Sequence, residues 1–382
     1  MKKMKAYLTG LVLSVLVLVV LVACGSDKTS SSNTNTQKDS QVVSSTETEA
    51  ITETQTETET QIVTGTADGV ESPDNVPSGS DSDEVYGQWV GTVLVVGKTG
   101  YETVGYSETY AASYAQIVND IANGLSGYST VYCIPVPKSS GICYDDAYES
   151  VVHKTNQGTS IDNVLAKMGS NVVSVDVYDT LRAHRDEYLY FRTDHHWTQL
   201  GAYYTYTEFC NAKGISSHNL SEYNQLVFEG FVGSLYRYSN NYAPFNRYPD
   251  TVYAYEPICN ATMTIQSGGS SYSHPIISDV TNSSAGNKYG CFIGGDSAMC
   301  VMTNNDLSDG SSCILVKESY GNAFAPFLID HYQTVYVIDA RYWSGNLITF
   351  AQENGVDDVI ILNNLSAVFT GARQDELKSI VY

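Results

Sequence analysis

Two widely separated segments of this chain carry the side-chain types that nucleophilic acyl transfer needs. The first is Asp194-His195-His196-Trp197, where a carboxylate and an imidazole lie two residues apart beside a tryptophan. A carboxylate that hydrogen-bonds an imidazole holds it in one tautomer and stabilises its charged form, which prepares a general base. Such a pair lacks a nucleophile, and Ser319 offers one more than a hundred residues later.

Ser319 lies between an apolar strand pattern at 313–316 and a helical pattern that starts at Asn322. A serine in this position is exposed at the carboxyl end of a strand. The backbone N–H groups that follow it, beginning with Tyr320 and Gly321, should then point at whatever the serine attacks and stabilise an oxyanion. We therefore expect Ser319 to be the nucleophile and residues 320–322 to support it.

A second candidate nucleophile is Ser297, which follows Gly294, Gly295 and Asp296. The residues on either side of this serine predict a strand–turn–strand context, which lacks the helix N-terminus that oxyanion chemistry exploits. We therefore favour Ser319. Gly295 and Ser297 are still expected to line the site, because glycine allows close approach of the backbone.

Within the first segment we assign His196 as the base, Asp194 as its partner and Trp197 as the residue that packs the loop. Successive side chains of a loop generally point apart, so His195 should be structural or contact substrate. A packed loop whose polar groups only satisfy one another is the structural alternative. An Asp-His-His metal site would need a further ligand that the sequence does not single out, so neither a metal nor a cofactor is expected.

Residues 1–23 have the pattern of a bacterial lipoprotein signal peptide. Basic residues precede an apolar run from Leu8 to Val22, and small residues precede Cys24. This pattern resembles a lipobox, which implies cleavage before Cys24 and a diacylglycerol on its thiol. An uncleaved transmembrane anchor is the alternative, because the apolar run is nearly long enough to span a bilayer. Both predict an extracytoplasmic protein tethered to the cell membrane.

Residues 24–85 are rich in Ser, Thr and Glu and have too little apolar surface to offset the entropy of ordering. We expect a disordered tether. It holds about half of the formal net charge of −22, so the acidity carries no information about a ligand. The 20 Lys and Arg residues form no cluster, which argues against nucleic-acid binding. Besides Cys24, seven cysteines without a Cys-x-x-Cys pair argue against a zinc site and a complete disulfide framework.

Residues 86–382 alternate between strand and helix patterns, which favours a mainly parallel sheet with helices on both faces. The stretch from about 216 to 290 is rich in Tyr, Ser, Asn and Gly and is expected to be an irregular, β-rich insertion. Strands are predicted at 89–98, 130–137, 171–175, 313–316, 334–338 and 356–362, and helices at 106–125, 160–167 (capped by Thr159 or Ser160), 198–210, 322–331, 347–352 and 365–381.

The stretch YFRTDHHWTQLGAYYTY, with KESYGNAFAPFL and YVIDARYW further on, resembles the DHHW family of bacterial exported proteins. That family is similar to the SGNH-hydrolase-like proteins of alginate O-acetylation. The resemblance implies a flavodoxin-like three-layer αβα sandwich with the motif order permuted, Asp194 and His196 as the base pair, and Ser319 as the nucleophile. Where relatives have Asp before the serine, this chain has Glu318, which either keeps a turn-capping role or marks relaxed activity.

Arg341 matches the family's Asp-x-Arg-Tyr pattern and is expected either to bind a substrate substituent or to contact Asp339. The leading hypothesis is a cell-envelope acyl-transfer enzyme, a polysaccharide O-acetyltransferase or an acetylesterase. Its partners would be a cell-surface polysaccharide and, as acyl donor, a membrane acyltransferase. The alternative is a non-catalytic, lipid-anchored glycan-binding or assembly protein that uses the same cleft.

Overall fold

The computed structural model describes residues 87–148, 152, 155–267 and 269–382. The predicted signal peptide, Cys24 and the tether at 24–85 lie outside these residues. Within the described ranges, no helix has the length and apolarity needed to cross a membrane. The seven cysteines between Cys133 and Cys313 are all free thiols.

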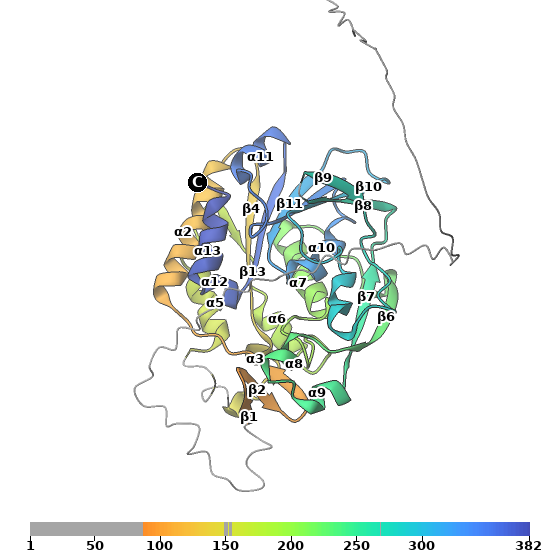
Figure 1. The fold of residues 1–382 in the computed structure, drawn as a ribbon. Coiled ribbons are helices and arrows are strands. Elements are labelled where there is room, and N and C mark those ends of the chain that lie inside the picture. Colours follow the sequence, from red (N-terminus) through yellow and green to blue (C-terminus); the bar gives the residue numbers. More distant parts are fainter. Residues whose placement is uncertain (1–86, 149–151, 153–154, 268) are drawn as a thin grey trace, which may run out of the picture. The chain divides into compact units, whose positions relative to one another are not determined.

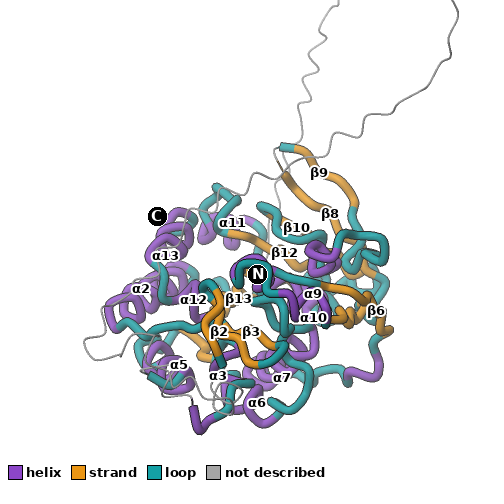
Figure 2. Tube along the Cα trace, turned by 60° about the horizontal axis from the view of Figure 1, so that its bottom comes forward, coloured by secondary structure: helices purple, strands orange, loops and turns teal. Residues whose placement is uncertain are grey.

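The protein has a mixed α/β fold around an eight-stranded sheet, whose order is β5-β4-β13-β11-β12-β10-β8-β9. Five neighbouring strands, from β5 to β12, are parallel, and β10, β8 and β9 continue the sheet in antiparallel pairs. Figure 2 shows β9 at the outer edge, beyond β8. The strands are β4 (Thr130–Val136), β5 (Val172–Ser174), β8 (Ala261–Ser267), β9 (Ser270–Ser273), β10 (Met299–Asn304), β11 (Ser312–Lys317), β12 (Thr334–Asp339) and β13 (Asp358–Asn364).

The parallel strands have a permuted order. Counted from β11 as the first strand, the order from β12 to β5 is 2-1-3-4-5, the order of flavodoxin-like sheets. The chain enters this order at its fourth strand, β4, and reaches its first strand, β11, only after the fifth. Ligands of such sheets bind at the carboxyl ends of the strands where the order reverses. Here that place is the end of β11 at Lys317, two residues before Ser319.

Helices cover both faces of the sheet (Figure 1). One hydrophobic core lies between the sheet and α2, α5, α11, α12 and α13, and a second lies beneath α7, α10 and the two-stranded sheet of β6 (Asn224–Phe231) and β7 (Asp250–Glu256). The helices are α2 (Glu108–Gly124), α3 (Ser139–Ile142), α5 (Gln157–Leu165), α6 (Tyr178–Ala183), α7 (Gln199–Lys213), α8 (Ser234–Tyr238), α9 (Ala243–Arg247), α10 (Gly321–Leu328), α11 (Leu347–Glu353), α12 (Leu365–Val368) and α13 (Gly371–Ser379), with 3₁₀ segments η2 (Asp146–Tyr148), η3 (Leu220–Glu222) and η4 (Ala285–Cys291).

The segment 89–98 differs from its prediction as one buried strand. It forms a separate antiparallel meander of β1 (Gln88–Val90), β2 (Val93–Val96) and β3 (Thr99–Tyr101). Gly91, with φ of +63°, makes the first turn, which a glycine adopts without strain. Trp89 is consequently 51% exposed.

Three further predictions differ from the structure, either in where an element begins or ends or in which sheet its strands join. In the stretch 216–290, β6 (Asn224–Phe231) and β7 (Asp250–Glu256) form a separate two-stranded antiparallel sheet, but β8 and β9 join the central sheet. The last helix is interrupted, because α12 ends at Val368 and α13 begins at Gly371. Helix α5 begins earlier than predicted, since the side chain of Asn156 caps it.

Candidate active site

The loop that carries Asp194 and His196 is closed at its base. An antiparallel bridge pairs Tyr190 with Trp197, and the N–H of Phe191 donates to the carbonyl of His196 at 3.2 Å. Helix α7 follows directly, capped by the side chain of Thr198. The loop is therefore short and held by hydrogen bonds at both ends, which limits how far the imidazole of His196 can move.

A buried carboxylate also anchors this loop. Asp250, at the start of β7, is fully buried and accepts hydrogen bonds from the hydroxyl of Thr193 at 2.6 Å and from its N–H at 2.7 Å. Its other oxygen accepts from Nε of Arg192 at 3.0 Å. Asp250 lies more than fifty residues from the loop in sequence, and no motif marked it as a partner.

The structure brings Asp194, His196 and Ser319 into one chain of hydrogen bonds. Nδ1 of His196 lies 2.5 Å from Oδ1 of Asp194, and Nε2 lies 2.7 Å from Oγ of Ser319. Oδ2 of Asp194 accepts from the backbone N–H of Ser234 at 2.7 Å. Asp194 and His196 are buried, while Ser319 is partly exposed. With Nδ1–H donated to Asp194, Nε2 is left to accept the serine proton.

Asp194 is held in its charged form. Burial alone would raise the pKa of its carboxyl, but the charges of His196 and His195 and the hydrogen bonds from His196 and Ser234 hold that pKa well below its usual range. An ionised carboxylate at this position keeps Nδ1 of His196 protonated and favours the imidazolium that forms when the base takes a proton.

Gly233 allows Asp194 to reach this position. A Cβ built on Gly233 would lie 2.2 Å from both Cβ and Oδ2 of Asp194. We therefore expect Gly233→Ala to displace the carboxylate and to destabilise the fold by about 1–3 kcal/mol. Urea unfolding measures this effect. In the control Gly286→Ala, the new Cβ would lie 3.7 Å from its nearest neighbour, so wild-type behaviour is expected.

The imidazole of His196 lies between two other rings. Tyr289, in η4, stacks on it with centroids 3.9 Å apart and planes 7° apart, and the ring of His195 lies on it with centroids 3.8 Å apart. The hydroxyl of Tyr289 donates to the backbone carbonyl of Ser319 at 3.0 Å. Tyr289 thus contacts both the base and the serine segment. Nothing in the sequence distinguishes it from the other tyrosines.

Trp197 and Tyr320 join the two segments. Nε1 of Trp197 donates to the carbonyl of Tyr320 at 2.9 Å, and their rings pack with centroids 5.3 Å apart. The hydroxyl of Tyr320 donates to the backbone carbonyl of His195. Both side chains are fully buried, so they hold the base loop against the serine turn.

Glu318 caps the serine turn. Its Oε2 accepts from the N–H of Tyr320 at 3.1 Å, and its Oε1 accepts from the N–H of Asn364, at the end of β13, at 2.9 Å. These hydrogen bonds match the turn-capping role expected for Glu318. Its Oε2 also lies 3.4 Å from Oγ of Ser319.

The backbone N–H groups after Ser319, which we predict as oxyanion donors, have acceptors within the turn in this structure. The N–H of Gly321 donates to the carbonyl of Glu318 at 2.8 Å, and that of Asn322 to the carbonyl of Ser319 at 3.2 Å. With the Tyr320 N–H bound to Glu318, all three already have acceptors inside the turn. The tightness of the turn explains this, since a Cβ on Gly321 would lie 2.4 Å from Cβ of Lys317.

Ser297 lies outside this hydrogen-bond chain, because its Oγ contacts Sγ of Cys300 at 3.0 Å. Ile293, Gly294 and Gly295 before it have φ values of +50°, +74° and +86°. No atom lies within 4 Å of a Cβ built on Gly295, so this glycine supplies a left-handed backbone and not the close approach we expected.

The three residues with positive φ, 293–295, place Asp296 in an ionic cluster beside the serine turn. Nζ of Lys317 lies 2.9 Å from both Asp296 and Asp339, and the guanidinium of Arg341 contacts the same two carboxylates at 2.7 and 2.6 Å. Nδ2 of Asn322 also donates to Asp296 at 3.0 Å. Arg341 therefore makes the predicted contact with Asp339.

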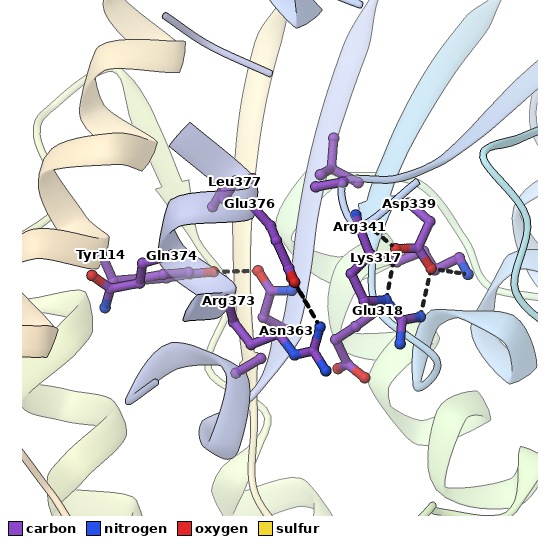
Figure 3. A pocket seen from close by; sticks show the side chains of 13 residues that line it. Tyr114, Lys317, Glu318, Asp339, Arg341, Asn363, Arg373, Gln374, Glu376 and Leu377 are labelled. Atoms are coloured by element: carbon purple, nitrogen blue, oxygen red, sulfur yellow. Dashed lines mark hydrogen bonds and ion pairs between the residues drawn. The ribbon is translucent and has the colours of Figure 1, made fainter. Parts of the chain in front are cut away.

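A pocket adjoins this cluster at the carboxyl edge of the sheet (Figure 3). Glu318, Arg341 and Asn363 line it on the sheet side, and Arg373 and Glu376 of α13 line it opposite. The charge of Arg341 is neutralised by its two carboxylates, so we expect no anion site on it alone.

Asp194, His195 and His196 also have the composition of a metal site, with ligand atoms within 4.8 Å of one another. However, Oδ1 of Asp194 already accepts from His196, and Nε2 of His196 faces Ser319. A metal ion here would have to break these hydrogen bonds and would gain only three protein ligands. The donor set therefore fits proton transfer better than metal binding.

The histidine next to the base should make stability depend on pH. Burial and the neighbouring His196 lower the pKa of His195 to about 4, against the opposing effects of Asp194 and Glu102 and with a contribution from Lys138. The unfolded chain binds this proton near pH 6.5, so unfolding takes up a proton between these values. We expect the free energy of unfolding to fall from pH 6.5 to pH 4 by about 3 kcal/mol from this residue.

Urea unfolding at several pH values measures this slope. His195→Asn should flatten it. An unchanged slope in His195→Asn would contradict a partly buried histidine that is neutral in the folded protein. His331 contributes to the residual slope, since burial also lowers its pKa to about 4.

The architecture and the hydrogen-bonded Ser, His and Asp place this molecule among α/β proteins with a polar cluster at the carboxyl edge of a parallel sheet. The chain belongs to the DHHW protein family, whose sequence profile matches residues 41–338. A DHHW family protein from Eubacterium siraeum is 29% identical, with a TM-score of 0.69 over 77% of this chain and 97% of that one.

Bacillus cereus PatB1, solved with a sulfonyl adduct, is 17% identical, with a TM-score of 0.62 over 75% of this chain and 97% of its own. A second PatB1 structure is 18% identical, with the same TM-score, over 74% and 98%. At this identity the likeness establishes a shared fold. No functionally curated protein matches the sequence.

Proposed function

We propose that this protein is an SGNH-like acyl-transfer enzyme that moves acetyl groups with Ser319, His196 and Asp194. The single observation that carries the proposal is the 2.7 Å hydrogen bond between Oγ of Ser319 and Nε2 of His196, whose other nitrogen is bound to Asp194. Nucleophile, base and orienting carboxylate need this geometry, and it lies within the reach of direct proton transfer.

In the first half-reaction, Oγ of Ser319 bonds to the carbonyl carbon of an acetyl ester and its proton passes to Nε2 of His196. The bond between that carbon and the leaving oxygen then breaks, and the imidazolium protonates the leaving group. In the second, a hydroxyl gives its proton to His196, its oxygen bonds to the acetyl carbon, and Ser319 leaves and regains the proton. A sugar hydroxyl makes the protein an O-acetyltransferase, and water makes it an esterase.

The family context directs the proposal to a cell-surface polysaccharide as acceptor, because the DHHW family resembles the proteins of alginate O-acetylation. A membrane acyltransferase would supply the acetyl group. The signal-peptide pattern and Cys24 support an extracytoplasmic, lipid-anchored location. Metabolic labelling with a radioactive fatty acid tests the anchor, which Cys24→Ala should abolish.

A serine-directed sulfonyl fluoride tests the proposed chemistry on the full chain. Attack by Oγ of Ser319 on the sulfur expels fluoride, and His196 takes the proton. We expect one sulfonyl group on the peptide that contains Ser319, a parallel loss of acetyl-ester turnover, and much slower labelling of His196→Ala. Labelling at another residue, or full turnover after stoichiometric labelling, would refute the proposal.

One observation favours the alternative of a non-catalytic glycan-binding protein. The N–H groups of Tyr320, Gly321 and Asn322 are engaged within the turn, so they are not free to stabilise an oxyanion. Glycan binding that is unaffected by Ser319→Ala, together with no labelling by the sulfonyl fluoride, would establish this function in place of the first.

A further inference from the structure

Three polar side chains beside the base loop take no part in the proposed acyl transfer. Glu102 follows β3, Lys138 follows β4 at the carboxyl edge of the sheet, and His195 lies between Asp194 and His196 in the loop. Nζ of Lys138 lies 2.7 Å from Oε2 of Glu102 and 3.5 Å from the carbonyl of His195. These contacts join the meander, the sheet edge and the base loop in one cluster.

The three side chains of the cluster differ in their exposure to solvent. Lys138 is 2% exposed, whereas the side chains of Glu102 and His195 are 27% and 26% exposed. The cation therefore lies behind, over the ring of Tyr320 at 4.9 Å, and the carboxylate and the imidazole reach solvent. A ligand that approaches the cluster meets Glu102 and His195 first.

The charge on the accessible side of the cluster disfavours an anionic ligand. Burial alone would raise the pKa of the Glu102 carboxyl, but Lys138 and His195 lower it below its usual value, so the carboxylate is ionised. Lys138 and Glu102 neutralise each other, and His195 is neutral near pH 7. The accessible face thus offers a carboxylate and an uncharged imidazole, which suit neutral hydroxyl groups and repel carboxylates.

The orientation of His195 is fixed by Ser234. Nδ1 lies 2.5 Å from Oγ of Ser234, on the side of Asp194. Among the residues that the structure describes, Nε2 has no hydrogen-bond partner, so it is the ring atom left for a ligand. The ring also lies against that of the proposed base, with centroids 3.8 Å apart. A ligand bound at Nε2 of His195 is therefore separated from the imidazole of His196 only by the ring of His195.

We propose that Nε2 of His195 and the carboxylate of Glu102 form an acceptor subsite that binds neighbouring hydroxyl groups of an uncharged sugar. A hydroxyl both donates and accepts, so it satisfies the imidazole in either tautomer, and a second hydroxyl donates to the carboxylate. This subsite rests on the proposed function, because it explains how a sugar hydroxyl, and not water alone, is presented to the acyl group on Ser319.

Binding calorimetry on full-length Ser319→Ala tests the subsite without turnover. The probes are cellohexaose, maltohexaose and chitohexaose, with hexamannuronate as the anionic comparison. We expect at least one neutral hexasaccharide to bind, and Glu102→Gln and His195→Ala each to raise its Kd about tenfold or more, because each removes a hydrogen bond to the ligand. His195→Asn serves as a second variant, and thermal unfolding checks that each variant is folded.

Matched controls away from the cluster are Glu108→Gln and His184→Ala, which should leave the Kd unchanged. The subsite is refuted if no neutral hexasaccharide binds, if only hexamannuronate binds, or if the Glu102 and His195 variants bind like the parent. Failure of the acyl-transfer proposal would give a different result. In that case the sulfonyl fluoride would not label Ser319, but the sugar would still bind and Glu102→Gln would still weaken its binding.

Discussion

Ser319→Ala is expected to lower turnover of a chromogenic acetyl ester by at least about 10³-fold while leaving the fold intact. In the proposed mechanism the hydroxyl forms the bond to the acetyl carbon, and the chain offers His196 no other nucleophile within hydrogen-bond reach among the described residues. The side chain is small and partly exposed, so its loss removes chemistry and little packing. Initial rates and thermal unfolding, measured on the same preparation, separate the two effects.

The matched control for this variant is Ser297→Ala. Ser297 follows Gly-Gly-Asp and was the rival nucleophile, but its hydroxyl contacts Sγ of Cys300 and not the imidazole. We expect this variant to keep most of the turnover. The assignment of the nucleophile would be wrong if Ser297→Ala lost activity and Ser319→Ala retained it.

The pairing of Ser319 with His196 could be predicted because each lies in a recognisable local pattern. The serine follows a buried strand and precedes a helix, and the base lies beside Asp194 just before another helix. Both patterns end at one edge of a parallel sheet, where side chains from distant segments meet. Local sequence therefore pointed to the groups that the structure brings into hydrogen-bond contact, without knowledge of the strand order.

The residues that hold those groups in place could not be predicted in this way. Tyr289 stacks on His196, Ser234 donates to Asp194, and Asp250 anchors the loop, each through a contact between segments far apart in sequence. Tyr, Ser and Asp are also common surface residues, so their types carry no signal. Such contacts depend on how β6, β7 and η4 pack around the loop, which periodicity does not encode.

The N–H groups on which the oxyanion prediction relies have acceptors within the turn for a local reason. A tight turn between strand and helix can use its own N–H groups as internal donors, and here Glu318 is long enough to fold back onto the N–H of Tyr320. The sequence showed a glutamate directly before the serine. It did not show that the Glu318 carboxylate would also accept a hydrogen bond from the N–H of Asn364, at the end of the neighbouring strand β13.

Asp194→Asn is expected to lower kcat by about 10³- to 10⁴-fold. The carboxylate accepts from Nδ1 and N–H of His196 on one oxygen and from the N–H of Ser234 on the other. An amide has only one acceptor oxygen, so its NH₂ must face a donor on one of the two sides. The variant also loses the negative charge that stabilises the imidazolium.

A second measurement distinguishes loss of this charge from general disruption of the loop. The pKa of Asp194 is held below its usual range, so its carboxylate contributes stability that is present above about pH 4 and is lost as the pH falls further. Asp194→Asn should therefore be less stable than the wild type at pH 7, and the difference should narrow on acidification below pH 4. A difference in unfolding free energy that stays constant with pH, or a kcat close to that of the wild type, would show that Asp194 does not act as the charged partner of His196.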